Sequence, residues 1–470
     1  MSQPCGHVID LDALNDDDAS DMDVSQHSVM DVDEMDVEEP DIPQHVGPGP
    51  DTLPGIMQAF RWPYLAAQAL GRHMLPAQLQ RSCLTRTWRV STHFSGLGSA
   101  ELALQLLEHA AAGLTGGVGP QFNLVSACEK QPSRQRVLRT RLPQDCHIFD
   151  DIMERFRDLP ELSETVDWRG IWSRMPDAFL GQGIAARCRQ HLHSQCRLAA
   201  PPDLDISGSP CQVWSSMGSR GGSQDNRIVL FLAWAYLIRT GECKIIIHEN
   251  VSGFKEGILL ELLSDTFEVV TLEVHPWHCG FRIIARPRKY SVLFRRRNIE
   301  VVSDVHEVYR QLSQSLADWQ KQPDLEEFLL TSEQGLLQEE NQARASKKLT
   351  DKQRGYLQKY QEQGAVRQTR NVVYDLSQNP EKRPIQTSQQ TGSLPCLRSG
   401  SLLWMPDRRR WLVDAELAAL MGFPSSEPLK NLYGVPDIFC PARSQVGTAM
   451  HVGCVGLVAL VALACARDRS

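Results

Sequence analysis

The chain has 470 residues, of which 42% are hydrophobic and 23% charged, and its formal net charge is −8. This length predicts about two or three domains and a sizeable core. The amino terminus lacks the basic region and apolar core of a secretory signal. We therefore expect the thirteen cysteines to be free thiols and exclude a secreted, disulfide-bonded protein.

Charge is distributed unevenly along the chain. Residues 1–50 contain fourteen Asp and Glu and neither Lys nor Arg, which leaves the remaining chain net positive. An acidic segment with so little apolar surface does not fold alone, so we predict a disordered acidic tail over residues 1–55. It either solvates the protein or binds a protein partner or a basic cleft.

The first informative motif is a strand, a glycine turn and a helix. Residues 88–93 have a strand pattern, Phe94, Gly96 and Gly98 lie in the turn, and residues 101–107 have an apolar helical pattern. Glycines let the backbone approach a ligand closely, and the helix offers unpaired N–H groups at its amino end. The pattern is typical of nucleotide binding, although many α/β proteins use such a turn only to make the bend.

Acidic residues follow the next two predicted strands. The strand over residues 122–127 ends before Glu129, which is placed to accept hydrogen bonds from ribose hydroxyls. The strand over residues 147–149 ends before Asp150 and Asp151, where a carboxylate could face the amino group of an adenine. A helix cap is the alternative interpretation of this acidic pair.

A compact group of metal-ligand residue types comes next. Cys188, His191, His193 and Cys196 form a C-x2-H-x-H-x2-C pattern. Thiolate and imidazole are ligands that zinc prefers, and four of them could hold the ion tetrahedrally. The usual spacing of a zinc finger is absent, so a polar loop remains the alternative.

A cysteine follows the buried strand predicted over residues 203–207. Gly208 and Pro210 end this strand, because proline removes a hydrogen-bond donor and fixes its own backbone angle. Cys211 therefore lies just past the carboxyl end of the strand, where open parallel α/β sheets bind ligands. Most cysteines are small buried residues, but this position favours a nucleophile.

The following elements add an acid. An apolar helix is predicted over residues 228–238 and a buried strand over residues 243–247, which ends before Glu249. Glu249 and Cys211 would form an acid and a nucleophile if their strands lie side by side.

Two arginines come before the next core strand. Arg286 and Arg288 precede the strand predicted over residues 290–294. They could orient a glutamate or bind phosphates, and a solvated basic face is the alternative.

The character of the chain changes after residue 300. Apolar residues at helical spacing occur over residues 308–319, a basic helix is predicted near residues 349–360, and residues 378–392 are polar and rich in turns. This indicates an inserted smaller domain. The chain then returns to order with a helix over residues 415–421. The apolar run over residues 452–466 is too short for a membrane span, which needs roughly 18 or more residues, and predicts a buried helix.

Six motifs in this order resemble the cytosine-5 methyltransferase family. They are Phe94-x-Gly96-x-Gly98, Pro210-Cys211-Gln212, Glu249-Asn250-Val251, Arg286-x-Arg288, Glu416 to Pro424 and Gln445-Val446-Gly447. The resemblance implies an α/β fold with a doubly wound, mostly parallel sheet of the Rossmann-like class I methyltransferase type, together with a smaller target-recognition domain. It implies a catalytic domain over residues 56–300, a recognition domain over 301–424 and a segment over 425–470 that returns to the catalytic domain.

The resemblance also implies a cofactor and its binding residues. S-adenosylmethionine would lie near Phe94, Gly96 and Gly98. Glu129 would bind its ribose, Asp151 would bind its adenine, and Ile152 would pack on the ring.

The resemblance further implies a covalent mechanism. A Cys211 thiolate, favoured by nearby arginine, would add to carbon 6 of a flipped-out cytosine. Glu249 would donate a proton to ring nitrogen 3. The paired Arg286 and Arg288 would complete the catalytic set, with Arg288 holding Glu249 and the base carbonyl.

Two positions depart from the family pattern. Ile284 stands where the family has a glutamine, so docking of a loop in the family's manner is in doubt. Thr448 stands where the family has an asparagine, so the fit of the last helix against the target pocket is in doubt. We predict a nuclear DNA cytosine-5 methyltransferase. A tRNA methyltransferase on the same scaffold would have a shorter insert, and a non-catalytic nucleic-acid-binding relative would have lost Cys211, Glu249 or Arg288.

Overall fold

The computed structural model describes most of the chain after residue 58. The described residues are 59–74, 82–114, 119–159, 167–191, 195–198, 200–215, 225–319, 324–329, 342, 344–363, 372–382, 394–433 and 441–469. The acidic tail predicted over residues 1–55 lies outside them. No helix in the described part of the chain is long and apolar enough to cross a membrane.

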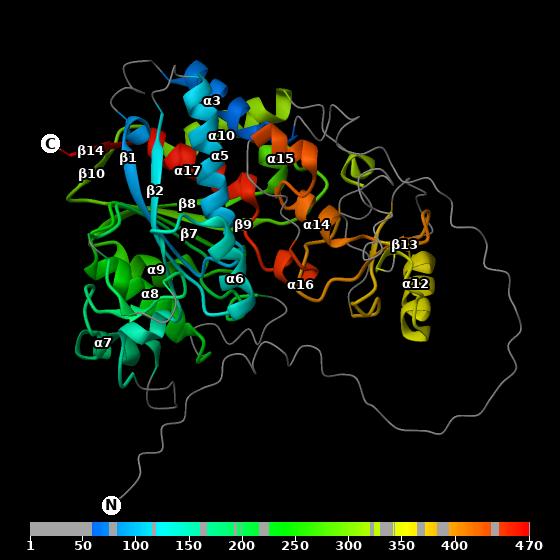
Figure 1. Ribbon diagram of the computed structural model, residues 1–470, viewed down its shortest axis with the longest axis horizontal. Helices are drawn as coiled ribbons and strands as arrows, with labels where there is room; N and C mark the ends of the chain where they lie inside the picture. Colours follow the sequence, from blue (N-terminus) through cyan, green and yellow to red (C-terminus); the bar gives the residue numbers. More distant parts are fainter. Residues whose placement is uncertain are drawn as a thin grey trace, which may run out of the picture. The chain divides into compact units, whose positions relative to one another are not determined.

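Seven strands form the main sheet, in the order β3-β2-β1-β6-β7-β9-β8 (Figure 1). They are β1 (Thr87–His93), β2 (Gln121–Cys128), β3 (His147–Phe149), β6 (Leu204–Ser207), β7 (Ile245–Val251), β8 (Phe267–Val274) and β9 (Arg288–Arg295). Neighbouring strands are parallel, except that β9 is antiparallel to both β7 and β8. The doubly wound, mostly parallel sheet is confirmed, and its winding reverses between β1 and β6, where such sheets bind ligands.

Helices cover both faces of this sheet (Figure 1). One face carries α3 (Trp62–His73), α5 (Ser99–Leu114), α10 (Val305–Trp319) and α17 (Val452–Ala464), and the other carries α7 (Trp168–Ala178), α8 (Ile228–Thr240) and α9 (Glu256–Leu263). Strand β7 shows the reason: Ile245 and Ile247 enter the core of the first face, and Ile246 enters the core of the second. Successive strand side chains point to opposite faces, so a strand that is apolar throughout needs cover on both.

Helix α17 confirms the prediction of a buried carboxyl-terminal helix. Every residue from Val452 to Ala464 is buried. A Cβ atom at Gly456 would lie 2.0 Å from a ring carbon of Trp62, so only glycine lets α3 cross α17 this closely.

The remaining elements are shorter. They are η2 (Cys83–Thr85), α6 (Pro132–Arg141), η3 (Ile152–Arg155), β4 (Ala186–Arg187), β5 (Gln195–Cys196), η5 (Pro276–Cys279), β10 (Ile299–Val301), η6 (Leu325–Phe328), α12 (Asp351–Gln363), β11 (Tyr374–Asp375), β12 (Leu403–Met405), β13 (Arg410–Trp411), α14 (Asp414–Leu420), α15 (Glu427–Tyr433), α16 (Arg443–Val446) and β14 (Ala466–Asp468). Strand β4 pairs with β5, β10 pairs with β14, and β11, β12 and β13 form a small sheet.

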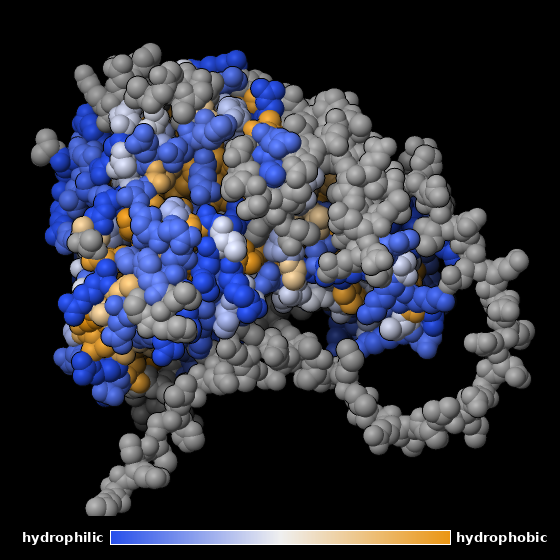
Figure 2. All heavy atoms as spheres, viewed as in Figure 1, coloured by the Kyte–Doolittle hydropathy of each residue, from blue (hydrophilic) through white to orange (hydrophobic). Residues whose placement is uncertain are grey.

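This small sheet and α12 share a separate apolar cluster. The cluster contains Tyr360, Tyr374, Leu376, Trp404 and Trp411, and the surface around α12 is mainly hydrophilic (Figure 2). The predicted recognition domain therefore needs a correction at both ends. Helix α10 packs against α3 and α17, and the apolar residues of α14 belong to the same main core.

Candidate active site

The glycine turn between β1 and α5 leaves open space beside its backbone. Gly96 and Gly98 have φ angles of 58° and 79°, in the left-handed region that favours glycine, and Phe94 has a φ of 55°. A Cβ atom at Gly96 would have only the carbonyl oxygen of Phe94 nearby, at 3.9 Å. A ligand therefore has room to lie against this turn.

Glu129 lies beside the glycine turn and holds it. One carboxylate oxygen accepts a hydrogen bond of 2.8 Å from the N–H of Gly96, and the other accepts one of 2.8 Å from the N–H of Gln131. Each carboxylate oxygen can accept a further hydrogen bond. The side chain can thus fix the turn and also meet ribose hydroxyls.

Asp151 caps the short helix η3, as the alternative interpretation of this residue required. Its Oδ1 atom accepts a hydrogen bond of 2.9 Å from the N–H of Met153, and its Oδ2 atom lies 3.5 Å from the Lys130 ammonium. The following residue, Ile152, is buried. Asp151 and Glu129 follow adjacent parallel strands, so they lie at the same edge of the sheet.

Cys211 is partly exposed and follows β6 at this edge. Its carbonyl oxygen accepts hydrogen bonds from the N–H groups of Trp214 and Ser215, at 2.9 and 2.8 Å. The cysteine therefore begins a tight turn, which fixes the direction of its backbone.

Strand β7 holds the residues just before Cys211. The side chain of Asn250 donates a hydrogen bond of 3.2 Å to the carbonyl oxygen of Ser209, and the Ser209 hydroxyl lies 2.8 Å from Nε2 of His248. Burial lowers the pKa of His248 to about 3, so the ring is neutral and its Nε2 atom can accept a hydrogen bond from the Ser209 hydroxyl. Two side chains of one strand thus position the turn that presents the cysteine.

Glu249 lies within β7 and not after it, because β9 pairs with β7 as far as the Val251–Arg288 pair. This register brings Arg288 to Glu249, with 3.1 Å between Nε and Oε1. The other oxygen of Glu249 would lie 3.3 Å from a Cβ atom at Gly208, in the segment that leads to Cys211. The acid, the arginine and the cysteine turn are therefore adjacent.

Arginine favours the Cys211 thiolate as expected, but burial outweighs this effect. Burial raises the pKa of this thiol, Arg288 lowers it, Glu249 raises it and Arg286 lowers it, and the pKa ends above its ordinary value. The physical reason is that removing an anion from water costs more here than the two guanidinium groups return. Its surroundings therefore make Cys211 harder to ionise than an ordinary cysteine.

Arg286 is directed to backbone carbonyl oxygens, and its place in the catalytic set stays a prediction. Its guanidinium donates to the carbonyl oxygens of Leu397, Gly447 and Ala449, at 2.9, 3.2 and 2.8 Å. Arg286 is buried. Of the paired arginines, Arg288 contacts the acid and Arg286 anchors the two segments that return to the sheet.

The two departures from the family pattern have structural partners. The hydroxyl of Thr448 accepts a hydrogen bond of 2.7 Å from Arg134 of α6, so this position still joins the returning segment to the large domain. Ile284 is buried and forms a backbone bridge with Leu394.

A second cysteine next to the arginines was not predicted. Cys396 Sγ lies 3.8 Å from Arg288 and 3.7 Å from Arg286. Burial raises the pKa of Cys396, but the two arginines lower it by a larger amount. The pKa of this thiol therefore lies below its ordinary value. The repeated Pro-Cys dipeptide, at Pro395-Cys396 as at Pro210-Cys211, is the signal that could have revealed it.

Three of the four predicted metal ligands are described, and they lie together. The sulfur atoms of Cys188 and Cys196 are 3.5 and 3.4 Å from Nδ1 of His191. The fourth, His193, lies outside the described residues.

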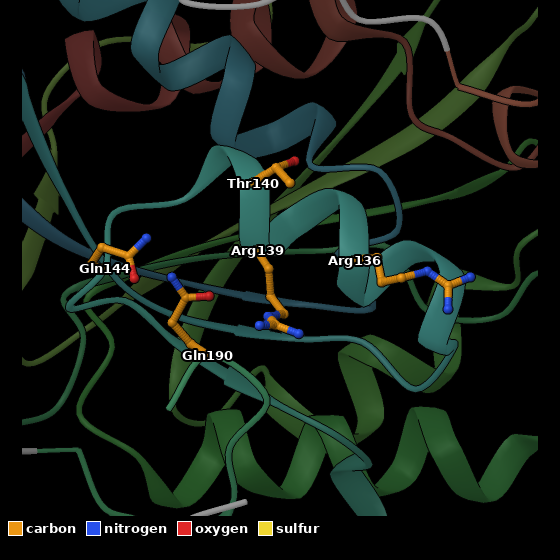
Figure 3. A pocket seen from close by; sticks show the side chains of 5 residues that line it. All are labelled: Arg136, Arg139, Thr140, Gln144 and Gln190. Carbon is orange, nitrogen blue, oxygen red and sulfur yellow. The ribbon is translucent and has the colours of Figure 1, made fainter. Parts of the chain in front are cut away.

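A cavity of 310 Å³ lies away from the carboxyl edge of the sheet (Figure 3). Its lining residues are Arg136, Arg139, Thr140, Gln144 and Gln190. The first three belong to α6, and Gln144 precedes the amino end of β3. The cavity thus shares no residue with the predicted cofactor site.

Comparisons with known proteins are consistent across much of the chain. The family profile described as C-5 cytosine-specific DNA methylase matches residues 191–461. The type II methyltransferase M1.ScrFI of Lactococcus lactis subsp. cremoris is 34% identical over 112 residues, which are 22% of this chain and 29% of that protein. The type II methyltransferase M.HhaI of Haemophilus parahaemolyticus is 34% identical over 79 residues, which are 16% of this chain and 24% of that protein.

These matches span less than a third of the length of either relative. Among solved structures, the Dnmt2 methyltransferase of S. pombe matches 80% of this chain and 98% of its own, with 15% identity and a TM-score of 0.45.

Proposed function

The chain belongs to the C-5 cytosine-specific DNA methylase family, and from this premise we propose that it transfers a methyl group from S-adenosylmethionine to carbon 5 of cytosine in DNA. Members of this family use S-adenosylmethionine. The observation that most directly supports the proposal is the contact of Glu249 with Arg288 beside the turn that carries Cys211.

The residues at the sheet edge fit S-adenosylmethionine, which supplies an electrophilic methyl group when it is bound. The open side of Gly96 lets the backbone approach the ligand closely, and Phe94 flanks the same turn. Glu129 would accept hydrogen bonds from the ribose hydroxyls through its remaining lone pairs. Asp151 and Ile152 would bind the adenine, the first by a hydrogen bond and the second by packing.

Cys211 is proposed to act as the nucleophile. Its thiolate adds to carbon 6 of the cytosine, which forms a sulfur–carbon bond and makes carbon 5 electron-rich. Carbon 5 then takes the methyl group. The methyl donor would leave as S-adenosylhomocysteine. Loss of the carbon 5 proton to water, return of the nitrogen 3 proton to Glu249 and breaking of the sulfur–carbon bond then restore the aromatic ring and the free cysteine.

Glu249 is proposed to act as the acid for the first step. Addition of the thiolate places negative charge on the ring, and a proton donated by Glu249 to nitrogen 3 removes it. Arg288 holds Glu249 through the Nε–Oε1 contact and has further donors for the carbonyl oxygen of the base. Arg288 and Arg286 both lower the pKa of Cys211, so they favour the thiolate that adds to the base.

Nucleic acid is proposed to lie against the small unit formed by α12 and its sheet. Exposed basic side chains occur on and next to α12, at Lys347, Lys348, Lys352, Arg354 and Lys359. Such side chains contact phosphates without reading sequence. The target cytosine would have to leave the base stack to reach Cys211. With DNA as the substrate, we predict that the protein acts in the nucleus.

Transfer of a labelled methyl group tests the proposal. The full chain is incubated with labelled S-adenosylmethionine and, in separate reactions, with unmodified duplex DNA, hemimethylated duplex DNA and tRNA. We expect label in DNA, its loss in Cys211→Ala, and a decrease of about 100-fold or more in Glu249→Gln, since an acid catalyst contributes about 10²–10⁴-fold. Cys83→Ala is the matched control, because Cys83 lies before the amino end of β1, and it should keep full activity.

A covalent adduct tests the mechanism separately. DNA that carries 5-fluorocytosine should stay bonded to the wild-type protein, because fluorine cannot leave carbon 5 as a proton does. The Cys211→Ala variant should form no denaturation-resistant adduct. Label in tRNA alone would overturn the DNA substrate and keep the mechanism, whereas DNA methylation by Cys211→Ala would overturn the mechanism.

A further inference from the structure

Four metal-binding side chains converge at the edge strand β3, apart from the candidate active site. They are His147, Cys188, His191 and Cys196, and their ligand atoms all lie within 4.8 Å of one another. Cys188 is fully buried, and the other three are partly buried. We propose that these four residues bind a structural zinc ion.

The separations between the ligand atoms fit a tetrahedral zinc site. Nδ1 of His191 lies 3.5 Å from Sγ of Cys188 and 3.4 Å from Sγ of Cys196, and Nδ1 of His147 lies 3.9 Å from Sγ of Cys188. Zinc bonds of about 2.3 Å to sulfur and about 2.0 Å to nitrogen place these atoms about 3.5 Å apart in a tetrahedron. Three of the six separations are therefore close to those of a bound ion, and small side-chain movements would bring in the rest.

The outer contact of His191 directs its lone pair toward the sulfur atoms. Nε2 of His191 lies 3.0 Å from the backbone carbonyl oxygen of Gln144. A carbonyl oxygen only accepts, so Nε2 carries the ring proton and Nδ1 is left with a lone pair. Histidines that bind a metal usually donate their other N–H group in this way.

The fourth ligand comes from a different part of the chain than the sequence pattern indicated. His193 completes the local C-x2-H-x-H-x2-C pattern, but His147, the first residue of β3, lies next to Cys188 although the two are 41 positions apart. Cys188 forms a backbone bridge with Phe149 of the same strand, and this pairing brings His147 into the cluster.

The proposed ion would fasten the β4–β5 hairpin to the edge of the main sheet. The hairpin pairs Ala186 with Cys196, and the N–H of Arg189 donates a hydrogen bond of 2.7 Å to the carbonyl oxygen of Ile148 in β3. Together with the bridge between Cys188 and Phe149, this hydrogen bond covers the edge of the sheet at β3. Zinc would therefore add a direct link between β3 and the hairpin to the apolar packing of Phe149 and Ala186 in the second core.

The hairpin supports the strand end that carries the predicted adenine site. Arg189 forms an ion pair with Asp150, and the Asp150 carboxylate also accepts a hydrogen bond of 2.6 Å from Gln135. Asp150 immediately precedes Asp151. The same loop supplies Gln190, which lines the cavity of Figure 3 together with Arg139 of α6. Loss of the ion should thus weaken the support of Asp150 and of the neighbouring predicted adenine site at Asp151.

A second group of candidate ligands among the described residues lacks these features. Cys279, His451 and Cys454 are buried together but provide only three ligands. Nδ1 of His451 already accepts a hydrogen bond of 3.3 Å from the N–H of Cys454, so its lone pair is occupied. This second group provides a matched control.

Zinc content of the full chain tests the proposal directly. The protein is purified without a metal-affinity tag and dialysed, and its zinc is measured by inductively coupled plasma mass spectrometry. We expect one zinc ion per chain, its loss in Cys188→Ser combined with Cys196→Ser, and its retention in Cys279→Ser combined with Cys454→Ser. His147→Ala should lose the ion on dialysis, and His193→Ala should keep it.

Two further measurements test the site if the variants that lack a ligand do not fold. They are the spectrum of the cobalt(II)-substituted protein and the replacement of one ligand residue by another. Cobalt in place of zinc should give the intense visible bands of a tetrahedral site with sulfur-to-cobalt charge transfer. His147→Cys should keep the ion and strengthen the charge-transfer band, because a third thiolate replaces an imidazole.

Three outcomes would overturn the assignment. They are a zinc-free wild-type protein after growth with added zinc, equal zinc content in the wild type and the Cys188 and Cys196 double variant, and an octahedral cobalt spectrum. Loss of zinc in His193→Ala with retention in His147→Ala would overturn the role of His147.

Discussion

Cys211 is governed by the balance between its burial and three charged side chains. Burial and Glu249 raise its pKa, while Arg288 and Arg286 lower it. A thiol held in this way is protected from oxidation and alkylation in the resting protein, because only the thiolate is nucleophilic. We therefore expect Cys211 to ionise when the base arrives. A cysteine that was always ionised would be reactive before the base was bound.

The reactivity of Cys211 toward iodoacetamide should therefore rise steeply with pH. Because the pKa lies above the ordinary value of 9.0, each pH unit below it reduces the thiolate, and the alkylation rate, about tenfold. Glu249→Gln removes a charge that raises the pKa, so this variant should react several-fold faster than the wild type at pH 7. Peptide mass spectrometry resolves Cys211 from the other cysteines. A rate that is constant between pH 7 and 8 would show that the thiolate already exists and would contradict this account.

The elements of the fold meet closely where glycine permits. The crossing of α3 and α17 is the clearest case, because Gly456 lies directly against the ring of Trp62. Gly355 in the exposed face of α12 has no such neighbour, since a Cβ atom there would meet nothing within 4 Å. The two helical glycines therefore have opposite effects on stability.

Alanine at these two positions should shift the melting temperature in opposite directions. Gly456→Ala forces the helices apart and should destabilise the protein by about 1–3 kcal/mol, as overpacked cores do. Gly355→Ala should stabilise α12 by about 0.5–1 kcal/mol, because alanine loses less conformational freedom in a helix. Thermal unfolding followed by circular dichroism measures both. If the melting temperature changed equally in both variants, the α3–α17 contact would have room for a methyl group at Gly456, which would contradict this account.

The whole molecule depends on Arg286 for joining segments that are far apart in the chain. This one guanidinium links the start of β9 to residues near Leu397 and to the segment Gly447–Ala449. The approach is close, since a Cβ atom at Gly447 would lie 2.1 Å from the backbone of Arg398. Arg288, two residues later, instead contacts Glu249.

Lysine substitutions should separate these two roles. Arg286→Lys keeps the charge but cannot reach three carbonyl oxygens with one planar group, so it should cost about 2–3 kcal/mol of stability. Arg288→Lys keeps a cation beside Glu249 and should leave the melting temperature near that of the wild type. Methyl transfer should fall about tenfold or more, because lysine lacks the planar set of donors that contacts Glu249 and the base together. Melting curves and initial rates on the same preparations test both. A catalytic loss without a stability loss in Arg286→Lys would support the place of Arg286 in the catalytic set.

By itself, the amino-acid sequence determined the local features of this protein. The strands, the glycine turn, the position of Cys211 after a strand and the buried last helix follow from periodicity and turn residues, which act over a few neighbouring positions. The order of the motifs along the chain was also sufficient to indicate the family.

Only the tertiary structure decided which distant side chains meet. The register of β7 with β9 brings Arg288 to Glu249 and keeps Glu249 within the strand, the returning segments capture Arg286, and the bridge between Cys188 and Phe149 places His147 among the candidate metal ligands. The extent of burial, which raises the pKa of Cys211, and the packing of α10 into the main core likewise depend on what covers them. These outcomes are set by contacts between elements many residues apart, and local sequence patterns carry no information on such pairings.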